Sequence, residues 1–532
     1  MARVRTIGGL LVCVAISVRA RATTCNSVAG LKLPDTVITV AQDIGAGKFV
    51  PSEGRPSDLQ LTAYKGLPAF CRVRGVIKPS PESNIEFEVW LPTSGWNGRY
   101  VGVGNGGSGG FVNYAAENGP SLARALSDGF AASSTDTGHH GDNDDFSFAR
   151  GHREQRIDYH YRAIHETARA AKAAIRTFYG TAANHSYFSG CSDGGRQGLM
   201  EVQRYPADYD GVLVCSPAVH RTHSIGVWAW VAQAVAAEAG SEISPKKLSM
   251  VHDAVIGSCD ALDGLEDGVV AEPMKCRFDP ASLLCMGAES ERCLTQPQVT
   301  TLKKFYSGPQ NSKGAAIASG FLPGSETDPD GALSCPRCCV DAGPYGCKGS
   351  ALHRASIFLD GMFDTRFNVS TFDFDHDFQK LESTEDAKLT DTTNPNLKAF
   401  KDRGGKLILV HGWSDGADPA MLSVKYYESV VSTMGRNEVD QFLRFYMLAD
   451  VYHNASRGPG PTAFPEPMLT VLEEWVENKT APEAVIATRH KIDGYPTSGI
   501  ARTRPLCPYP EVAVYRGTGS IDDAVNFSCK LP

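Results

Sequence analysis

Short apolar runs rich in β-branched and aromatic residues recur along the chain, and segments with helical periodicity separate them. Between these runs, residues 157–179 are rich in alanine and contain no glycine or proline, which predicts a helix that stops at Gly180. Strands that alternate with helices are typical of the α/β class, with a mostly parallel sheet and crossover helices. The six runs that predict strands are 85–91, 99–103, 185–189, 211–214, 406–410 and 442–447.

The pattern changes between residues 220 and 400, where strand signals are few and glycine and proline are frequent. The segment also contains a cluster of cysteines and a polar stretch at residues 382–396. It separates the fourth and fifth predicted strands, which we expect in one sheet. We therefore predict a catalytic domain, formed by residues 23–219 and 401–532, that carries residues 220–400 as an inserted lid domain.

The composition narrows the class of protein without identifying a substrate. The chain has 532 residues, 42% hydrophobic and 21% charged, which is typical of a globular protein with a large buried core. Basic and acidic residues number 52 and 60, and no long basic run is present that could follow a phosphate backbone or an anionic membrane. Neither nucleic acid nor a membrane is therefore an expected partner, and the oligomeric state stays open.

The first 22 residues have the form of a secretory signal peptide. Two arginines precede an apolar stretch at residues 7–18, and Ala20-Arg21-Ala22 resembles a cleavage site. A membrane anchor is the alternative, but a helix across a bilayer core needs about 20 apolar residues. The 15 cysteines agree with export to an oxidising compartment. Sequons for N-glycosylation occur at Asn184, Asn368, Asn454, Asn478 and Asn526.

A candidate nucleophile lies between the third predicted strand and a helix-like segment. Residues 190–194 read Gly-Cys-Ser-Asp-Gly, which is the Gly-x-Ser-x-Gly pattern of a nucleophile elbow. A serine on such a strand-to-helix turn needs a strained backbone, and small glycines on both sides permit it. The pattern also occurs in glycine-rich loops that have no catalytic role. Its position after a strand favours Ser192 as the nucleophile of an α/β-hydrolase.

In this fold the partners of the serine follow in the order acid then histidine, each after a late strand. Asp415 follows the fifth predicted strand and His453 follows the sixth. We predict that Asp415 orients the imidazole of His453, which takes the serine proton and later delivers it to the leaving alcohol. Asp418 and Asp450 are alternative acids, and His490 is an alternative base.

A glycine-rich run at residues 102–110 follows the second predicted strand, where one arm of an oxyanion hole is expected. A phosphate-binding loop is the alternative. That alternative requires a helix that starts at the glycines and a nearby lysine or ribose-binding acid, and the sequence provides neither. We therefore assign the backbone N–H of Gly106 or Gly107, together with the N–H of Asp193, to the oxyanion.

Five motifs carry a resemblance to a known family. They are residues 67–73 (Leu-Pro-Ala-Phe-Cys-Arg-Val), the glycine-rich run, 136–139 (Asp-Thr-Gly-His), 189–198 (Ser-Gly-Cys-Ser-Asp-Gly-Gly-Arg-Gln-Gly) and His411-Gly412 with Asp415. Together they resemble the tannase and feruloyl esterase family, and the chain is similar to the secreted feruloyl esterases B of fungi. The family also includes a bacterial hydrolase of a terephthalate monoester. The resemblance covers most of the chain and implies an α/β-hydrolase core, a lid that shapes the acyl pocket, and a small-molecule ester substrate.

The resemblance also implies a structural calcium ion in the lid. Residues 259–269 match the calcium loop of the family. Calcium prefers several hard oxygens from a glycine-containing loop, although this spacing differs from that of an EF-hand. A solvated acidic turn is the alternative. The implied ligands are the side chains of Asp260, Asp263 and Asp267 and the carbonyls of Leu265 and Val269.

The positions of the cysteines match the family in part and depart from it at the candidate site. In the family, the cysteine before the nucleophile is bonded to a cysteine directly after the catalytic histidine, but Asn454 follows His453 here. Without that bond, packing alone would hold the histidine loop. Cys191 either pairs with Cys215, at the end of the next strand, or both stay reduced and buried. The resemblance implies four other disulfides: Cys25 with Cys71, Cys259 with Cys276, Cys285 with Cys293, and Cys507 with Cys529.

Four more cysteines lie close together in the lid and are expected to pair locally, with a zinc site as the weaker alternative in an exported protein: Cys335, Cys338, Cys339 and Cys347.

The leading hypothesis for function is an esterase that cleaves phenolic esters, such as feruloyl or galloyl esters, through an acyl-enzyme on Ser192. Alternatives are the same chemistry on another acyl ester in secondary metabolism, and a non-catalytic, calcium-stabilised binding protein of this fold. The presence of all three candidate residues argues against a binding protein, and peptidase activity has no support beyond the shared triad.

Overall fold

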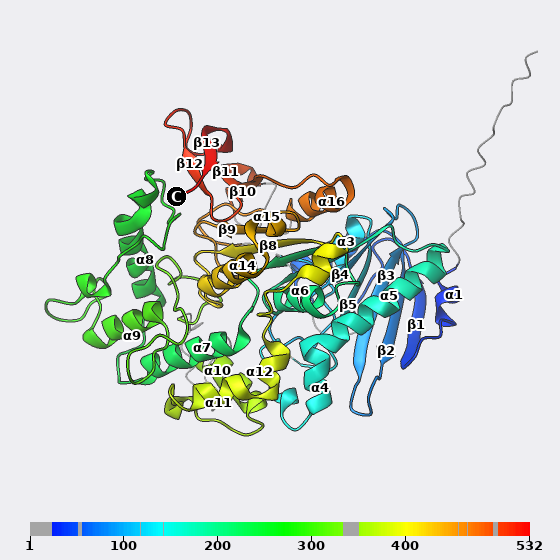
Figure 1. Cartoon of the computed structure of the whole chain (residues 1–532), viewed down its shortest axis with the longest axis horizontal. Coiled ribbons are helices and arrows are strands. Elements are labelled where there is room, and N and C mark those ends of the chain that lie inside the picture. Colours follow the sequence, from blue (N-terminus) through cyan, green and yellow to red (C-terminus); the bar gives the residue numbers. More distant parts are fainter. Residues whose placement is uncertain are drawn as a thin grey trace, which may run out of the picture.

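One mixed sheet forms the centre of the protein, which is described by a computed structural model (Figure 1). The structure describes residues 24–51, 56–116, 119–141, 143–333, 350–455, 457–464, 467–492 and 498–532. The strands of the sheet are β1 (Thr36–Ile44), β2 (Phe70–Ile77), β3 (Ile85–Pro92), β4 (Arg99–Val103), β5 (Ala131–Thr135), β6 (His185–Cys191), β7 (Gly211–Cys215), β8 (Lys406–Gly412) and β9 (Leu443–Leu448). Two separate hairpins follow, formed by β10 (Val485–His490) with β11 (Ile500–Leu506) and by β12 (Val512–Tyr515) with β13 (Phe527–Lys530).

The sheet has the order β1-β2-β3-β5-β4-β6-β7-β8-β9. The five pairings from β5 to β9 are parallel, and the three pairings from β1 to β5 are antiparallel. The predicted mostly parallel sheet is therefore confirmed, and all six predicted strands belong to it. Sequence patterning missed β1, β2 and β5. The residues of β5, Ala-Ala-Ser-Ser-Thr, are small and only one of them is β-branched, whereas β2 interrupts its apolar residues with two arginines and a glycine.

Helices cover both faces of the parallel strands. Within β7, Val212 and Val214 face a core shared with the helices α5, α6 and α14, whereas Leu213 faces a core shared with α3 and α16. The helices are α1 (Asn26–Ala29), α2 (Asp58–Lys65), α3 (Leu122–Ser127), α4 (Arg153–Ile157), α5 (Ala163–Tyr179), α6 (Asp193–Arg204), α7 (Arg221–Ala236), α8 (Pro245–Cys259), α9 (Gln296–Ser307), α10 (Ala351–Met362), α11 (Asp377–Ser383), α12 (Glu385–Thr390), α13 (Lys398–Asp402), α14 (Ala420–Met434), α15 (Arg436–Val439) and α16 (Met468–Asn478).

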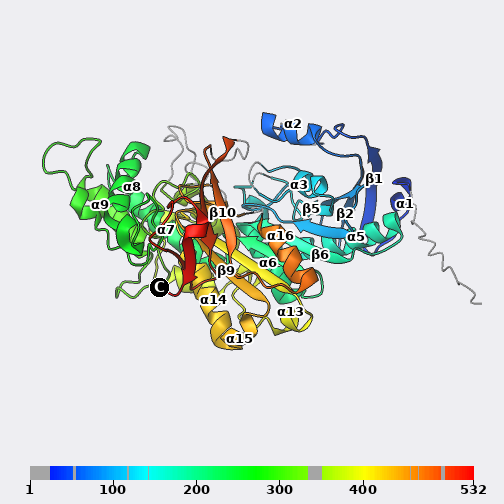
Figure 2. The same ribbon diagram turned by 90° about the horizontal axis from the view of Figure 1, so that it is seen from above.

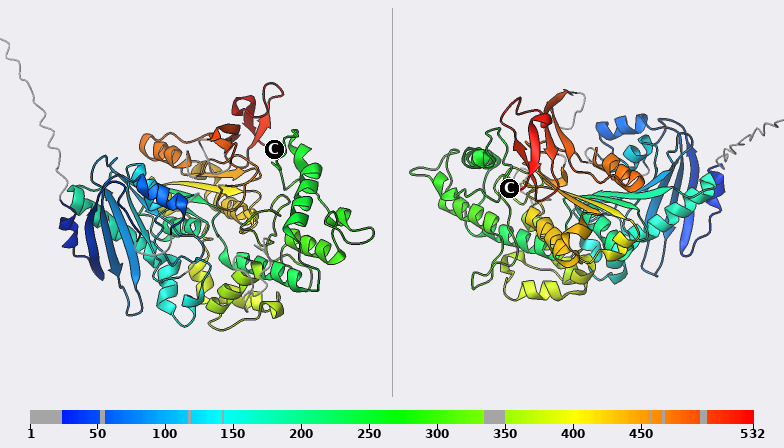
Figure 3. Two further views of the ribbon diagram at one scale, coloured as in Figure 1. Left: turned by 180° about the vertical axis from the view of Figure 1, so that it is seen from behind. Right: turned by 45° about the horizontal axis from the view of Figure 1, so that its top comes forward.

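The segment predicted as an insertion leaves the sheet after β7 and returns at β8, and these two strands pair directly. Its described parts, 220–333 and 350–400, contain helices and no strand of the sheet. These helices bury a core of their own, which includes Trp228, Phe305 and Phe358. Figures 1, 2 and 3 show them on the side of the molecule away from β1 and β2.

The helix predicted at 157–179 is present, but it is not regular at its start. A π-helical turn over Asp158–Arg162 separates α4 from α5. Such turns widen the backbone locally and are frequent at functional sites. The predicted end is confirmed, because Gly180 adopts a left-handed conformation with φ of 72° directly after α5.

Five disulfides cross-link the described residues, and they include all four pairs that the resemblance implies. The fifth joins Cys191 to Cys215, which are register partners on β6 and β7. The predicted signal peptide and the cysteines Cys335, Cys338, Cys339 and Cys347 lie outside the described residues. Among the helices that are described, none has the length and apolar character needed to cross a membrane.

Candidate active site

Ser192 occupies a tight turn between β6 and α6. Its backbone angles are φ 57° and ψ −121°, a conformation that non-glycine residues rarely adopt and that concentrates at functional sites. The turn requires close backbone approach, since a Cβ atom on Gly194 would lie 2.8 Å from the carbonyl oxygen of Asn105. The glycines of the Gly-x-Ser-x-Gly pattern are thus explained by sterics, as a nucleophile elbow requires.

The three residues predicted as a triad meet at the carboxyl end of the parallel strands. The imidazole Nε2 of His453 lies 2.9 Å from the hydroxyl oxygen of Ser192, and its Nδ1 lies 2.8 Å from Oδ2 of Asp415. Parallel strands bring their carboxyl ends to one edge of the sheet, so the loops after β6, β8 and β9 converge there. The arrangement joins nucleophile, base and acid in one hydrogen-bonded chain.

The alternative residues lie elsewhere in the structure. Asp418 accepts a hydrogen bond from the hydroxyl of Ser224 at 2.7 Å, and Asp450 accepts one from the hydroxyl of Ser414 at 2.9 Å. His490 ends β10 in a C-terminal hairpin. Among the described residues, none of these three shows a hydrogen bond with the Ser192 hydroxyl.

Burial and charge act against each other at the base and the acid. Burial disfavours the charged imidazolium of His453, but the charge and hydrogen bond of Asp415, together with the charges of Asp418 and Asp328, raise its pKa to about 9. Burial likewise favours neutral Asp415, yet the His453 charge and hydrogen bonds from His411 and His453 hold its pKa well below the usual range. Asp415 is therefore ionised at neutral pH and positioned to stabilise a protonated His453.

Two loops beside Ser192 carry the residues that are expected to form the oxyanion hole. Asp193 begins α6, and Gly106 and Gly107 belong to the loop after β4, which forms turns and no helix before α3. The phosphate-loop alternative thus lacks the helix that it requires. Tyr159 links the two loops, because its hydroxyl lies 2.8 Å from Oδ1 of Asp193 and 3.3 Å from the carbonyl oxygen of Gly107.

The side chain of Asp193 is buried and anchors the start of α6. Its carboxylate accepts hydrogen bonds from Arg196 at 2.6 Å and from Arg221 at 2.9 Å. Burial would raise the pKa of this carboxyl, but the charges of Arg196 and Arg221 keep it lowered. The π-helical turn contributes as well, since the carbonyl of His160 accepts a hydrogen bond from Arg196 at 2.9 Å.

The expectation that packing alone holds the histidine loop is wrong. Oδ2 of Asp328 accepts hydrogen bonds from the backbone N–H of His453 at 3.0 Å and from that of Gly416 at 2.8 Å. One buried carboxylate therefore ties together the loops that carry Asp415 and His453. Sequence reasoning missed Asp328, because it lies in the inserted segment within no recognisable motif.

The Cys191–Cys215 disulfide lies against the same loop. The sulfur atoms of Cys191 and Cys215 lie 3.6 and 3.4 Å from the carbonyl oxygen of Asn454. The disulfide thus packs against the histidine loop without a covalent bond to it. The sequence left open whether Cys191 and Cys215 form a disulfide or stay reduced, and in the structure they form the disulfide.

A cavity of about 290 Å³ opens onto Ser192 and His453. This volume is at the low end for ligand sites, which are typically about 300–1,000 Å³. Its walls include Gly106, Gly107 and Asp418 from the sheet loops. The inserted segment supplies a second wall with Arg221, Trp228, Arg354, Ile357 and Phe358.

The residues of the expected calcium loop also lie together. Asp260 accepts backbone hydrogen bonds from Asp267 at 3.1 Å and Gly268 at 2.8 Å, and Asp263 accepts one from Leu265 at 3.0 Å. Burial, with the charges of Asp267 and Asp260, raises the pKa of Asp263 to about 6, even though the Leu265 hydrogen bond opposes it. A bound cation would relieve this crowding of carboxylates, so the donor set fits calcium.

The five expected calcium ligands do not stand in equivalent surroundings. Asp267 also forms ion pairs with Arg504 and, at 3.3 Å, with Arg502, which partly neutralise its carboxylate. Asp260 and Asp263 have no arginine or lysine partner among the described residues. The fit to a cation is therefore strongest at these two side chains.

Comparison with known proteins agrees with the geometry. A family model described as tannase and feruloyl esterase matches residues 71–530. An uncharacterized esterase of Xanthomonas campestris pv. campestris is 37% identical over 95% of this chain and 91% of its own. A mono(2-hydroxyethyl) terephthalate hydrolase of Piscinibacter sakaiensis is 33% identical over 88% of this chain and 85% of its own.

A solved structure supports the same assignment. Feruloyl esterase B from Aspergillus oryzae superposes with a TM-score of 0.81 at 27% identity, over 96% of this chain and 100% of that chain. Together with the strand order, this likeness confirms the predicted α/β-hydrolase fold. The chain therefore belongs to the tannase and feruloyl esterase family and is a carboxylic ester hydrolase.

Proposed function

We propose that the protein is an exported serine esterase that cleaves esters of phenolic acids through an acyl-enzyme on Ser192. The observation that carries the proposal is the hydrogen-bonded chain from Ser192 through His453 to Asp415 at the mouth of the cavity. The five disulfides support export to an oxidising compartment. The signal peptide predicted at residues 1–22 is part of the same proposal.

The proposed reaction proceeds in two halves. His453 accepts the hydroxyl proton of Ser192 as the serine oxygen attacks the ester carbonyl, and the N–H groups of Asp193 and of Gly106 or Gly107 stabilise the resulting oxyanion. His453 then delivers that proton to the departing alcohol, which leaves an acyl group on Ser192. A water molecule, activated by the same imidazole, releases the acid and restores the serine.

The proposed acyl pocket is the wall contributed by the inserted segment, which acts as the lid domain. Trp228 and Phe358 present aromatic surface beside the cavity, and Ile357 adds an aliphatic side chain. Aromatic acyl groups pack well against such surfaces. The limited volume of about 290 Å³ favours a compact acyl group of the feruloyl or galloyl kind.

A panel of esters tests this proposal. Methyl hydroxycinnamates, methyl gallate and a short p-nitrophenyl ester should all be hydrolysed, with the highest kcat/KM on the aromatic acyl groups. A fluorophosphonate probe should label one residue, and mass spectrometry of the peptides should locate the label on Ser192. Labelling at another serine, or an equal rate on aliphatic acyl groups of any length, would count against the proposal.

A second candidate substrate is an aromatic ester whose acyl group carries a carboxylate. Arg354 lines the cavity, and its guanidinium forms no ion pair with a described residue, although it lies 5.7 Å from the ring centre of Trp228. A carboxylate on the substrate would find a cationic partner there. The terephthalate monoester after which the Piscinibacter relative is named has this chemistry.

Replacing Arg354 with alanine is expected to distinguish the two substrate classes. For an aromatic ester with a free carboxylate, kcat/KM should fall roughly 10- to 100-fold, which is what loss of a charged hydrogen bond costs. For methyl hydroxycinnamates the same variant should lose little, so the neutral substrate serves as the matched control. Equal losses on both substrates would show that Arg354 supports the pocket without recognising charge.

The activity is expected to rise with pH. Protonated His453 cannot accept the serine proton, and its pKa is raised to about 9, so kcat/KM should increase with pH, reach half of its maximum near pH 9 and level off above about pH 10. The midpoint belongs to the coupled pair of Asp415 and His453. Rates measured with a neutral ester between pH 5 and 10 check this, and a midpoint at or below pH 6.5 would contradict it.

Calcium is proposed as a structural ion on the loop that begins at Asp260. Adding calcium to the metal-free protein should raise Tm by about 4 °C at 100 times the Kd, with little change in the rate at 25 °C. Asp263→Asn should abolish most of this rise, whereas Asp253→Asn, on the exposed surface of α8, should retain it. A calcium effect that is equal in both variants would place the ion elsewhere.

A further inference from the structure

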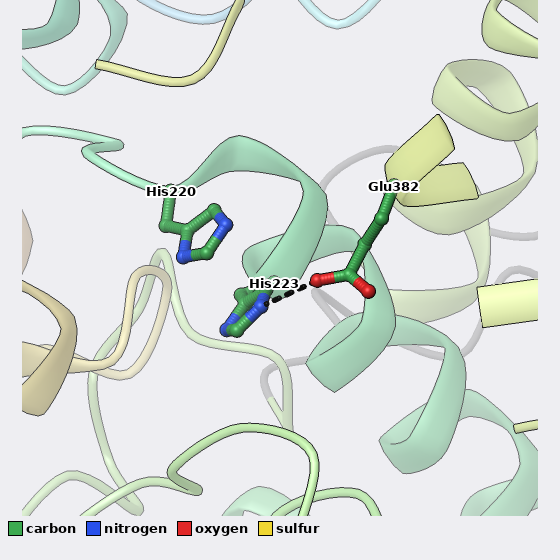
Figure 4. A group of neighbouring side chains, drawn as sticks. All are labelled: His220, His223 and Glu382. Atoms are coloured by element: carbon green, nitrogen blue, oxygen red, sulfur yellow. Dashed lines mark hydrogen bonds and ion pairs between the residues drawn. The ribbon is translucent and has the colours of Figure 1, made fainter. Parts of the chain in front are cut away.

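Two histidines at the start of the inserted segment lie beside a glutamate near its end, outside the candidate active site (Figure 4). His220 directly precedes α7, His223 is in the first turn of that helix, and Glu382 is on α11. Nε2 of His223 lies 3.2 Å from Oε1 of Glu382, and the two imidazole rings stack with centres 3.5 Å apart. One donor atom from each residue lies within 4.8 Å of the other two.

The protonation states of His220 and His223 favour metal binding. Burial lowers the pKa of His220 to about 4, and burial together with the neighbouring His220 lowers that of His223 to about 3. Both imidazoles are therefore neutral at neutral pH and keep a lone pair for a ligand. Glu382 pairs with no lysine or arginine among the described residues, and its side chain is 45% exposed, so solvent reaches the group.

We propose that His220, His223 and Glu382 bind one Zn²⁺ ion or a similar divalent transition metal. Imidazole nitrogen and carboxylate oxygen are common zinc ligands, whereas calcium takes oxygen ligands. Zinc bonds of about 2.0–2.2 Å require the three donor atoms to move closer, which rotation of the half-exposed Glu382 and the histidine rings permits. Water completes the coordination.

A second carboxylate supports the site. Oδ2 of Asp391 lies 3.4 Å from Nε2 of His220 and is positioned to orient that imidazole. Ligating histidines commonly donate their other ring N–H to such a carboxylate. Two further groups of possible ligands occur among the described residues, but each contains a single histidine, which makes them poorer zinc sites.

The metal would cross-link two parts of the inserted segment that are 159 residues apart in sequence. It would also fix the start of α7, where Arg221 reaches Asp193 at the start of α6. We expect the ion to stabilise this junction and not to take part in ester cleavage. The inference does not depend on the proposed function.

Zinc binding to the full-length protein tests the proposal. With calcium present in excess to fill the other loop, titration of zinc-free protein with Zn²⁺ should show one tight equivalent and a rise in Tm. His223→Ala and Glu382→Gln should each weaken this binding on the order of 100-fold, since even indirect partners of a metal are worth 10- to 100-fold. His376→Ala is the matched control, because His376 lies in the same segment with its side chain 80% exposed, and should bind as the wild type does.

A second measurement uses the unchanged protein and needs no variant to fold. Crystals soaked in zinc should give an anomalous difference peak between His220, His223 and Glu382. The proposal is overturned if the wild type binds no tight equivalent, if the His220→Ala/His223→Ala variant binds zinc as tightly as the wild type, or if the anomalous peak lies at other residues.

Discussion

Ser192→Ala is expected to lower kcat by about a millionfold and to leave the fold intact. The hydroxyl of Ser192 is the atom within 2.9 Å of His453, and no other hydroxyl among the described residues contacts that imidazole nitrogen. Removing the nucleophile of a serine hydrolase leaves only the catalysis supplied by the oxyanion site and substrate binding. The measurement is kcat on the best ester of the panel, with Tm as the check on folding.

A double variant sharpens this test. Ser192 and His453 should act as one unit, so His453→Ala should cost nearly as much as Ser192→Ala, and the double variant should lose little more. A folded Ser192→Ala protein that retains more than about one hundredth of the wild-type rate would be incompatible with the proposed mechanism. Additive losses in the double variant would mean that the two side chains act separately.

Asp415→Asn is expected to lower kcat about ten-thousandfold. The carboxylate of Asp415 accepts the Nδ1–H of His453 at 2.8 Å, which leaves Nε2 free to accept the serine proton. An asparagine amide can occupy the same space but can hold the imidazole in the wrong tautomer, a substitution known to cost about this much in serine proteases. KM should change little, because Asp415 does not line the cavity.

The same variant has a signature in the pH profile. Loss of the Asp415 charge removes the main cause of the raised His453 pKa, so the residual activity should reach its midpoint at a lower pH. Asp418→Asn is the comparison variant, because Asp418 bonds Ser224 and contributes less than Asp415 to the raised pKa of His453, so the midpoint should shift less. A larger loss in Asp418→Asn, or in Asp450→Asn, would assign the orienting acid to that residue.

Because Asn454 stands where the family resemblance implies a cysteine, another interaction must hold the loop that carries His453. The disulfide that the family resemblance implies cannot form here, because the residue directly after His453 is Asn454 and not a cysteine. Asp328 supplies noncovalent anchoring, with hydrogen bonds to both the acid and the histidine loops. A displacement of about 1 Å in such a loop can cost roughly a hundredfold in rate, so this anchoring matters for the chemistry.

Much of the fold was predictable from local pattern. The six predicted strands of the sheet were located to within one or two residues, because burial on both faces demands apolar side chains. The end of the long helix was predictable from Gly180, which tolerates the left-handed conformation. β1, β2 and β5 were not predicted, and in β5 the reason is that its residues are small and mostly not β-branched.

For the candidate site, sequence alone determined the residues whose roles follow from local geometry and chain order. The strained turn around Ser192 needs glycines at fixed spacing, and the loops after late strands carry Asp415 and His453, so each left a pattern in the sequence. The sequence did not decide between Asp415, Asp418 and Asp450 as the acid, or between His453 and His490 as the base.

The tertiary structure decided that choice and added the residues that no local pattern marks. Asp328 reaches His453 across 125 residues of sequence, and Glu382 reaches His223 across 159. Arg354 enters the cavity from a helix of the inserted segment. Contacts of this kind depend on how the inserted segment packs against the sheet, and side chains that meet only in the folded chain need no fixed spacing along it.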